Sequence, residues 1–148
     1  MSTKDMFSSN RVCFNLKATT KKQVIDELIE MLVQDGKLTN EGEFKEAVLR
    51  REEEASTSIG MGIAIPHGKS SSVIKASIVF GKSQKGIQFD SMDEEPTYLF
   101  FLMAAPHASG DVHLRDLSEI SEKLMNSEVR TQLNKANSLE ELINAFCV

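Results

Sequence analysis

His67 is the residue of this chain whose type and setting most favour chemistry. It stands in the stretch GIAIPHGKS, residues 62–70, between a proline and a glycine. Pro66 fixes its own φ angle and biases Ile65 toward extended backbone, while Gly68 permits a sharp exit or the close approach of another molecule. Neutral imidazole near pH 7 is a good nucleophile that can take and return a phosphoryl group. The alternative is a histidine in an ordinary turn, and the residues alone leave both readings open.

His113 is a second candidate for the same chemistry. It precedes Leu117, Ile120 and Leu124 at helical spacing, which places it on or beside an apolar stripe. By itself this pattern favours a histidine satisfied within the core. The alternative is a place in the first helical turn, where backbone N–H groups favour an anion and the ring could hydrogen-bond a phosphoryl oxygen.

Arg51 and Thr57 are further candidates, upstream of His67. Arg50 and Arg51 end a helix rich in acidic residues, and a solvated charge run accounts well for Arg50. One arginine turned toward His67 could stabilise a moving phosphoryl group through bidentate contacts. Ser56 and Thr57 could donate hydroxyls to the same anion or merely shape the loop.

Three other kinds of site fit the sequence poorly. The stretch HGKS resembles the end of a Walker A loop, which binds nucleotide phosphates. However, residue 63 is Ile where the first glycine of that motif should stand. In addition, Val73-Ile74 indicate a following strand, whereas the motif needs a following helix. The spacings of the three histidines and Asp111 match no familiar zinc pattern, so no metal is expected. A serine hydrolase would need a G-x-S-x-G elbow, which is missing.

Composition predicts one globular domain over residues 1–148. Apolar residues make up 41% and charged residues 26% of the 148 residues, and the net charge of −5 argues against nucleic acid as the main partner. Two cysteines without a CxxC motif, no apolar leader at the N-terminus and no long apolar run together favour a reducing cytoplasm.

The expected elements are two helices, then strands, then helices. Thr20, Asn40 and Ser138 are predicted helix N-caps, and helices are expected after each of them and over about 111–125 and 127–136. Strands are expected at 12–16, 63–65, 73–81, 86–93 (a short strand and turn) and 97–105, the last one central because it is apolar almost throughout. The predicted fold class is α/β (α+β), a mixed sheet of about five strands flanked by helices.

These residues together resemble a known family. The stretch RREEEASTSIGMGIAIPHGK, residues 50–69, is similar to the signature of the fructose/mannitol-type (type 2) EIIA domain of the bacterial phosphoenolpyruvate-dependent sugar phosphotransferase system. The resemblance continues through GIQFDSMDEEPTYLFFLMAAP, HLRDLSEISEKLM and SLEEL, from about residue 12 to 146, and favours the fructose type. One departure is Ser58, where the family often has glycine.

The resemblance implies a phosphotransferase that acts as a phosphohistidine relay. His67 would accept a phosphoryl group from the phosphocarrier HPr and pass it to a cysteine of an EIIB protein or domain, and so, with the membrane component EIIC, to the incoming sugar. The match of Arg51 implies charge stabilisation, and that of His113 implies a second histidine that orients or hydrogen-bonds the phosphoryl group. Thr57 would be a lesser member of the site. The family needs no metal, nucleotide or other cofactor.

Two further functions remain open at this stage. One is a regulatory phosphoprotein of the nitrogen-related branch of the family, which acts by phosphorylation-dependent protein binding. The other is an interaction domain that carries no phosphate on His67.

Overall fold

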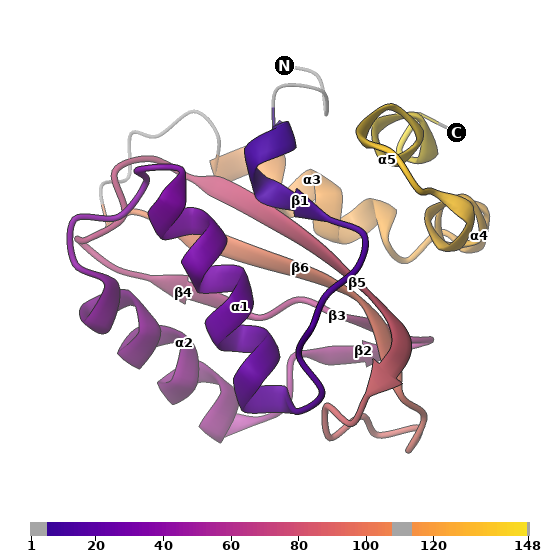
Figure 1. The fold of residues 1–148 in the computed structure, drawn as a ribbon, viewed down its shortest axis with the longest axis horizontal. Coiled ribbons are helices and arrows are strands. Elements are labelled where there is room, and N and C mark those ends of the chain that lie inside the picture. Colours follow the sequence, from indigo (N-terminus) through magenta and orange to yellow (C-terminus); the bar gives the residue numbers. More distant parts are fainter. Residues whose placement is uncertain (1–5, 108–113, 148) are drawn as a thin grey trace.

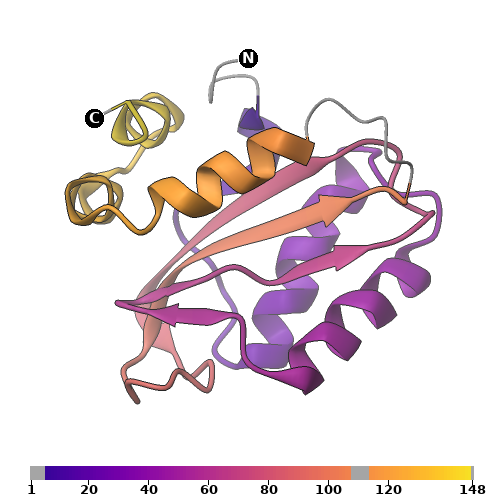
Figure 2. The same cartoon turned by 180° about the vertical axis from the view of Figure 1, so that it is seen from behind.

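A mixed sheet with helices on both faces forms the protein. The computed structural model describes residues 6–107 and 114–147. Helices α1 (Lys21–Gln34) and α2 (Glu41–Glu54) cover one face, and α3 (Leu114–Lys123), α4 (Ser127–Lys135) and α5 (Leu139–Ala145) cover the other (Figures 1 and 2). The predicted α+β class and flanking helices are therefore confirmed.

Strand β6 (Thr97–Ala105) is the centre of the sheet. Along one side it pairs antiparallel with β5 (Ser77–Ile87), and β5 pairs in parallel with the short β1 (Val12–Cys13). Along its other side β3 (Ile63–Ala64) and then β4 (His67–Lys69) pair with it in parallel, and β2 (Ser58–Gly60) pairs with β3. The sheet thus has six strands where about five were expected. Among the described residues β4 has no second strand partner, so it is an edge strand.

The two N-terminal helices begin at the caps that the sequence predicts. The Thr20 side chain accepts a hydrogen bond from the Gln23 N–H, and the Asn40 side chain accepts one from the Glu43 N–H. Each cap satisfies a backbone donor that the first helical turn leaves free. The apolar faces of α1 and α2 then pack against the alternate residues of β6 that point to their side, including Phe100 and Leu102.

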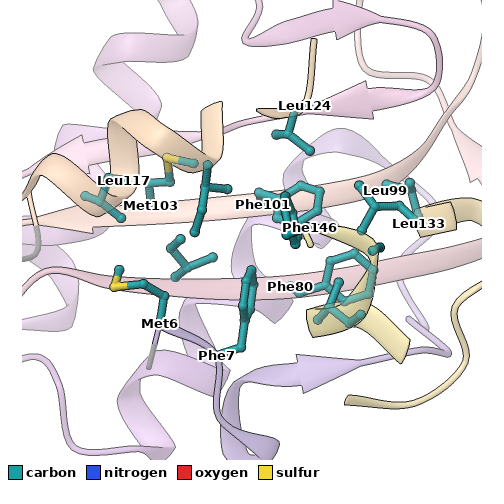
Figure 3. Close-up of a cluster of buried hydrophobic side chains, with 14 of the residues drawn as sticks. Met6, Phe7, Phe80, Leu99, Phe101, Met103, Leu117, Leu124, Leu133 and Phe146 are labelled. Atoms are coloured by element: carbon teal, nitrogen blue, oxygen red, sulfur yellow. The ribbon is translucent and has the colours of Figure 1, made fainter. Parts of the chain in front are cut away.

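The opposite face of the sheet carries the aromatic core. Phe80 and Phe101, from β5 and β6, lie 5.1 Å apart between ring centroids, and Phe146 and Phe7 pack onto them from the chain ends. Figure 3 shows these rings gathered with Leu and Met side chains between the sheet and the C-terminal helices. This cluster seats α3 on the sheet, which matters because α3 forms one wall of the cavity described below.

Next to α1, the N-terminal segment is fastened by an ion pair. Arg11, in the short 3-10 helix Ser9–Arg11, places Nη1 2.5 Å from Asp35 Oδ2, and both side chains are nearly buried. Its Nε also donates to the Ile78 carbonyl at 3.0 Å. The pair joins the start of the chain to the end of α1 and to β5.

Two expected strands are misplaced. The strand expected at 73–81 begins only at Ser77, because residues 70–73 form a turn in which the Ser72 N–H donates to the Ser70 hydroxyl and Val73 N–H to the Ser70 carbonyl. Serine hydroxyls that bond nearby backbone groups compete with strand pairing. The strand expected at 86–93 is wrong, because β5 itself continues to Ile87 and a loop follows.

No helix within the described ranges is both long and apolar enough to cross a bilayer.

Candidate active site

His67 is the first residue of β4, and backbone bonds hold it on both sides. It lies opposite Met103 in the parallel pairing of β4 with β6. The Met103 N–H donates to the Pro66 carbonyl at 2.9 Å, and the Ile65 N–H donates to the Thr57 carbonyl at 3.1 Å. The segment that leads into His67 is therefore fastened to β6 and to the residues that precede β2.

The imidazole ring of His67 is fixed by its own backbone. Its Nδ1 atom lies 2.8 Å from the carbonyl oxygen of Ile65. A carbonyl oxygen only accepts, so Nδ1 must carry the proton, and in the neutral ring Nε2 keeps its lone pair. Within the described residues Nε2 of the half-buried His67 has no hydrogen-bond partner, and it is the nucleophilic atom of this tautomer.

A cavity of about 310 Å³ opens beside His67. Its wall is mostly apolar and comes from β6, α3 and the segment before β4: Ile65, Met103, Ala105 and Leu117. An apolar wall limits the water that reaches a group bound to the histidine.

Lys69 lies on the same face of β4 as His67. A Cβ atom on Gly68, between them, would lie 2.8 Å from Val48 Cγ2, so the glycine faces α2 and its two neighbours face the cavity. Lys69 is exposed, and among the described residues no carboxylate is in ion-pair distance of it. Lys69 is not among the site residues predicted from the sequence, although its spacing of two from His67 in an extended segment is the signal for a shared face.

Two serines of α3 add polar groups to the opposite wall. Ser118 and Ser121 line the cavity, three residues apart on the helix. The Ser121 hydroxyl donates to the Leu117 carbonyl at 3.1 Å, whereas Ser118 is exposed. The sequence predicts only the apolar stripe of this helix, so neither serine is among the predicted site residues.

Arg51 and Thr57 are held by neighbours in the chain. Arg51, in the last turn of α2, donates from Nη1 to the Ala55 carbonyl at 2.8 Å. Thr57 is buried, and its hydroxyl donates to the Glu52 carboxylate, which also accepts the Thr57 N–H at 3.3 Å. Neither is among the residues that line the cavity beside His67.

His113 lies outside the described residues, so the structure does not place it. Within the described ranges, no group of three or more histidine, cysteine or acidic residues is arranged to hold a metal ion.

Comparison with known proteins identifies the family. The model of the family described as "Phosphoenolpyruvate-dependent sugar phosphotransferase system, EIIA 2" matches residues 5–147. The chain belongs to this family. Membership confirms the predicted type 2 EIIA resemblance and makes the chain a phosphotransferase component.

Two of the relatives carry fructose-specific names. The chain is 40% identical over 144 residues to a fructose-specific EIIABC component of Bacillus subtilis, a match that covers 97% of this chain and 23% of that protein. It is also 40% identical over 119 residues to a fructose-specific EIIA component of Haloferax volcanii, covering 80% of this chain and 77% of that one. The chain thus spans under a quarter of the length of the first relative.

A solved structure has the same fold. The nitrogen regulatory protein IIA-Ntr of Neisseria meningitidis superposes with a TM-score of 0.85 at 25% sequence identity, over 97% of each chain. The fold and the family of this EIIA chain therefore agree.

Proposed function

We propose that this EIIA chain is a phosphocarrier, a single domain over residues 1–148 that accepts a phosphoryl group from phospho-HPr on His67 and passes it to an EIIB component. The observation that carries the proposal is the hydrogen bond from His67 Nδ1 to the Ile65 carbonyl. It leaves one unprotonated, fixed nitrogen on a residue that lines a mostly apolar cavity.

The first half-reaction needs no proton transfer at His67. The Nε2 lone pair attacks the phosphorus atom of the phosphohistidine of HPr, a new N–P bond forms, and the donor N–P bond breaks. The electron pair of the broken bond returns to the donor nitrogen. Nδ1 keeps its proton throughout, and its bond to Ile65 stabilises the positive charge that the ring gains on attack.

The second half-reaction reverses these roles. A cysteine thiolate of EIIB attacks the same phosphorus, an S–P bond forms, and the N–P bond breaks with its electron pair left on Nε2. The protein then returns to its starting state. Because phosphoryl transfer depends mainly on in-line positioning and charge stabilisation, a fixed ring is the chief requirement.

Cationic and hydroxyl groups would stabilise the moving charge. We assign this role to Arg51 and His113, as the family resemblance implies, and add Lys69 and Ser118 because they line the cavity that His67 faces. A direct contact between the Thr57 hydroxyl and the phosphoryl group stays a prediction, because this hydroxyl donates its hydrogen bond to Glu52.

The proposal also covers the type of sugar and the cellular compartment. The names of the fructose-specific relatives support a fructose-type system in the cytoplasm, with membrane EIIC acting downstream of EIIB. A second candidate is a regulatory phosphoprotein, which the fold shared with a nitrogen regulatory protein favours. The transport role and the regulatory role would use the same His67 chemistry. They would differ only in the protein that responds to the phosphorylated His67.

Phosphate transfer from phosphoenolpyruvate through purified Enzyme I and HPr tests the proposal. We expect acid-labile phosphate on the wild type, none on His67→Ala, slower labelling of His113→Ala, and normal labelling of the control His107→Ala. Onward transfer to EIIB and sugar would support the transport role, whereas binding to another protein that depends on phosphorylation would support regulation. An unlabelled wild type with competent HPr would overturn both.

A further inference from the structure

Glu52 is a buried carboxylate one residue after Arg51, in the last turn of α2. Its side chain is 5% exposed, and both carboxylate oxygens have partners. The Lys21 ammonium lies 3.0 Å from Oε2, the Thr57 N–H donates to Oε2 at 3.3 Å, and the Thr57 hydroxyl donates to Oε1. Burying a carboxylate is costly unless donors of this kind compensate it.

Lys21 completes the anchorage from the opposite side. Its Nζ lies over the Phe89 ring, 4.6 Å from the centroid, and also 3.2 Å from the exposed Asp90 carboxylate. The ammonium is therefore held in place independently of Glu52. Glu52 ties α2 to α1 through this lysine and to the following loop through Thr57.

From Glu52, continuous hydrogen bonds lead to the reactive ring. The carboxylate holds Thr57 by its N–H and hydroxyl, and the Thr57 carbonyl accepts the Ile65 N–H at 3.1 Å. The Ile65 carbonyl in turn accepts the His67 Nδ1–H at 2.8 Å. The middle link joins backbone atoms alone, whereas the first uses the Glu52 carboxylate and the last uses the His67 ring.

Ile65 depends on this chain of bonds because proline follows it. Pro66 has no N–H, so within the described residues two backbone bonds fasten the segment between β3 and β4: the Pro66 carbonyl accepts from Met103 of β6, and the Ile65 N–H donates to the Thr57 carbonyl. If Thr57 shifts, one of the two anchors is lost and the carbonyl that orients the ring shifts with it.

We propose that Glu52 and Thr57 are positioning residues for His67: they fix the Ile65 carbonyl, and that carbonyl fixes the tautomer and aim of the ring. The inference rests on the proposed phosphocarrier function for its effect on rate. Its effect on the tautomer of the unphosphorylated protein is independent of any transfer.

Two substitutions with little change in shape test the chain of bonds. Thr57→Val removes the hydroxyl, and Glu52→Gln removes the charge that pairs with Lys21. Thr57→Ser keeps the hydroxyl and serves as the rescue variant, and Glu53→Gln changes an exposed glutamate of the same helix turn as the matched control. If either test variant fails to fold, as judged by thermal unfolding, Glu52→Asp takes its place, because it keeps the charge but withdraws it from Thr57.

The first measurement is ¹⁵N NMR of the histidine ring nitrogens in the unphosphorylated protein. We expect the Nδ1–H form of His67 in the wild type, Thr57→Ser and Glu53→Gln, and a gain of the Nε2–H form in Thr57→Val and Glu52→Gln. The second is the rate of phosphorylation by phospho-HPr. We expect about a tenfold or greater fall in the maximal rate, with the half-saturating HPr concentration unchanged.

The outcomes separate this inference from simpler ones. Folded variants with wild-type tautomer and rate overturn it, and so does a slower rate with an unchanged tautomer, since that result indicates a general loss of structure. A tautomer change with no phosphorylation even of the wild type overturns the phosphocarrier function but keeps the positioning role.

Discussion

The Nδ1 atom of His67 lies 2.8 Å from the carbonyl oxygen of Ile65, two residues earlier in the chain. The contact is local, so the His67 ring and the strand that carries it are aligned by the same short segment. It determines which ring nitrogen carries the proton and which keeps its lone pair.

The phosphoryl group is expected on Nε2 of His67. Nδ1 is engaged as a donor, and phosphorylation there would break its bond to Ile65. Two-dimensional NMR of the phosphorylated, ¹⁵N-labelled protein should show phosphorus coupled to Nε2, with Nδ1 still protonated. Coupling to Nδ1 would mean that the ring turns over before it reacts.

Replacing Lys69 by glutamine is expected to slow phosphoryl transfer by up to about tenfold. Lys69 shares the cavity face with His67, and an exposed cation close to a dianion contributes about 1 kcal/mol. Rapid-quench kinetics with phospho-HPr measure the effect, which should shrink at high salt. Lys75→Gln, an exposed lysine outside the cavity, is the control; an equal loss there would assign the effect to overall charge.

Gly68→Ala is expected to destabilise the fold by roughly 1–3 kcal/mol, since overpacking displaces neighbouring groups. The added Cβ would lie 2.8 Å from Val48 Cγ2 and 3.2 Å from the Val48 backbone N, leaving β4 no room against α2. Urea unfolding measures the change. Gly42→Ala is the control, because its Cβ meets nothing closer than 3.6 Å and alanine favours a helix by about 0.5–1 kcal/mol.

Acid is expected to weaken the fold through Asp35. Burial alone would raise the pKa of this carboxyl, but the hydrogen bond and charge of Arg11, together with Lys37, outweigh it and lower the pKa. A lowered folded-state pKa gives stability that is present above the unfolded value of about 4 and is lost as pH falls through the folded value. Asp35→Asn should therefore cost roughly 2 kcal/mol at pH 7, and its deficit should narrow below about pH 4 in urea unfolding. If the loss of stability in Asp35→Asn were the same at every pH, the stabilisation by Asp35 would not come from its charge.

Thr97→Val is expected to leave the stability unchanged or raise it by up to about 1 kcal/mol. Within the described residues, the Thr97 hydroxyl is the buried side-chain oxygen without a hydrogen-bond partner, and valine has nearly the same shape. Thermal unfolding measures the change. Thr39→Val should be destabilising by comparison, because that hydroxyl donates to the Ser72 carbonyl at 3.2 Å.

Local signals account for the parts of the fold that the sequence predicts well. Thr20, Asn40 and Ser138 were found as caps because each bonds a backbone N–H only three residues away. The range 97–105 was found as a strand because burial on both faces makes it apolar almost throughout. The turn of residues 70–73 was missed because serine side chains there take the bonds that an extended segment would give to a neighbouring strand.

The site shows the same division between local and distant information. His67 can be predicted as a site residue because the proline before it and the glycine after it are its neighbours in the sequence. Glu52 belongs to a charged run at the end of its helix, and nothing in the sequence shows that Lys21, some thirty residues earlier, turns its ammonium toward it. Ser118 and Lys69, far apart in the sequence, line one cavity only because α3 packs on the face of the sheet toward which Lys69 points.

The place of β4 at the border of the sheet has a consequence for the behaviour of the protein in concentrated solution. A strand with one free side can recruit a strand from another molecule and so start aggregation. Here the exposed length is only three residues, proline interrupts the run just before it, and a lysine ends it. These are the features by which proteins protect open sheet borders. The residues around His67 therefore leave its ring open to the cavity while discouraging the molecule from pairing with itself.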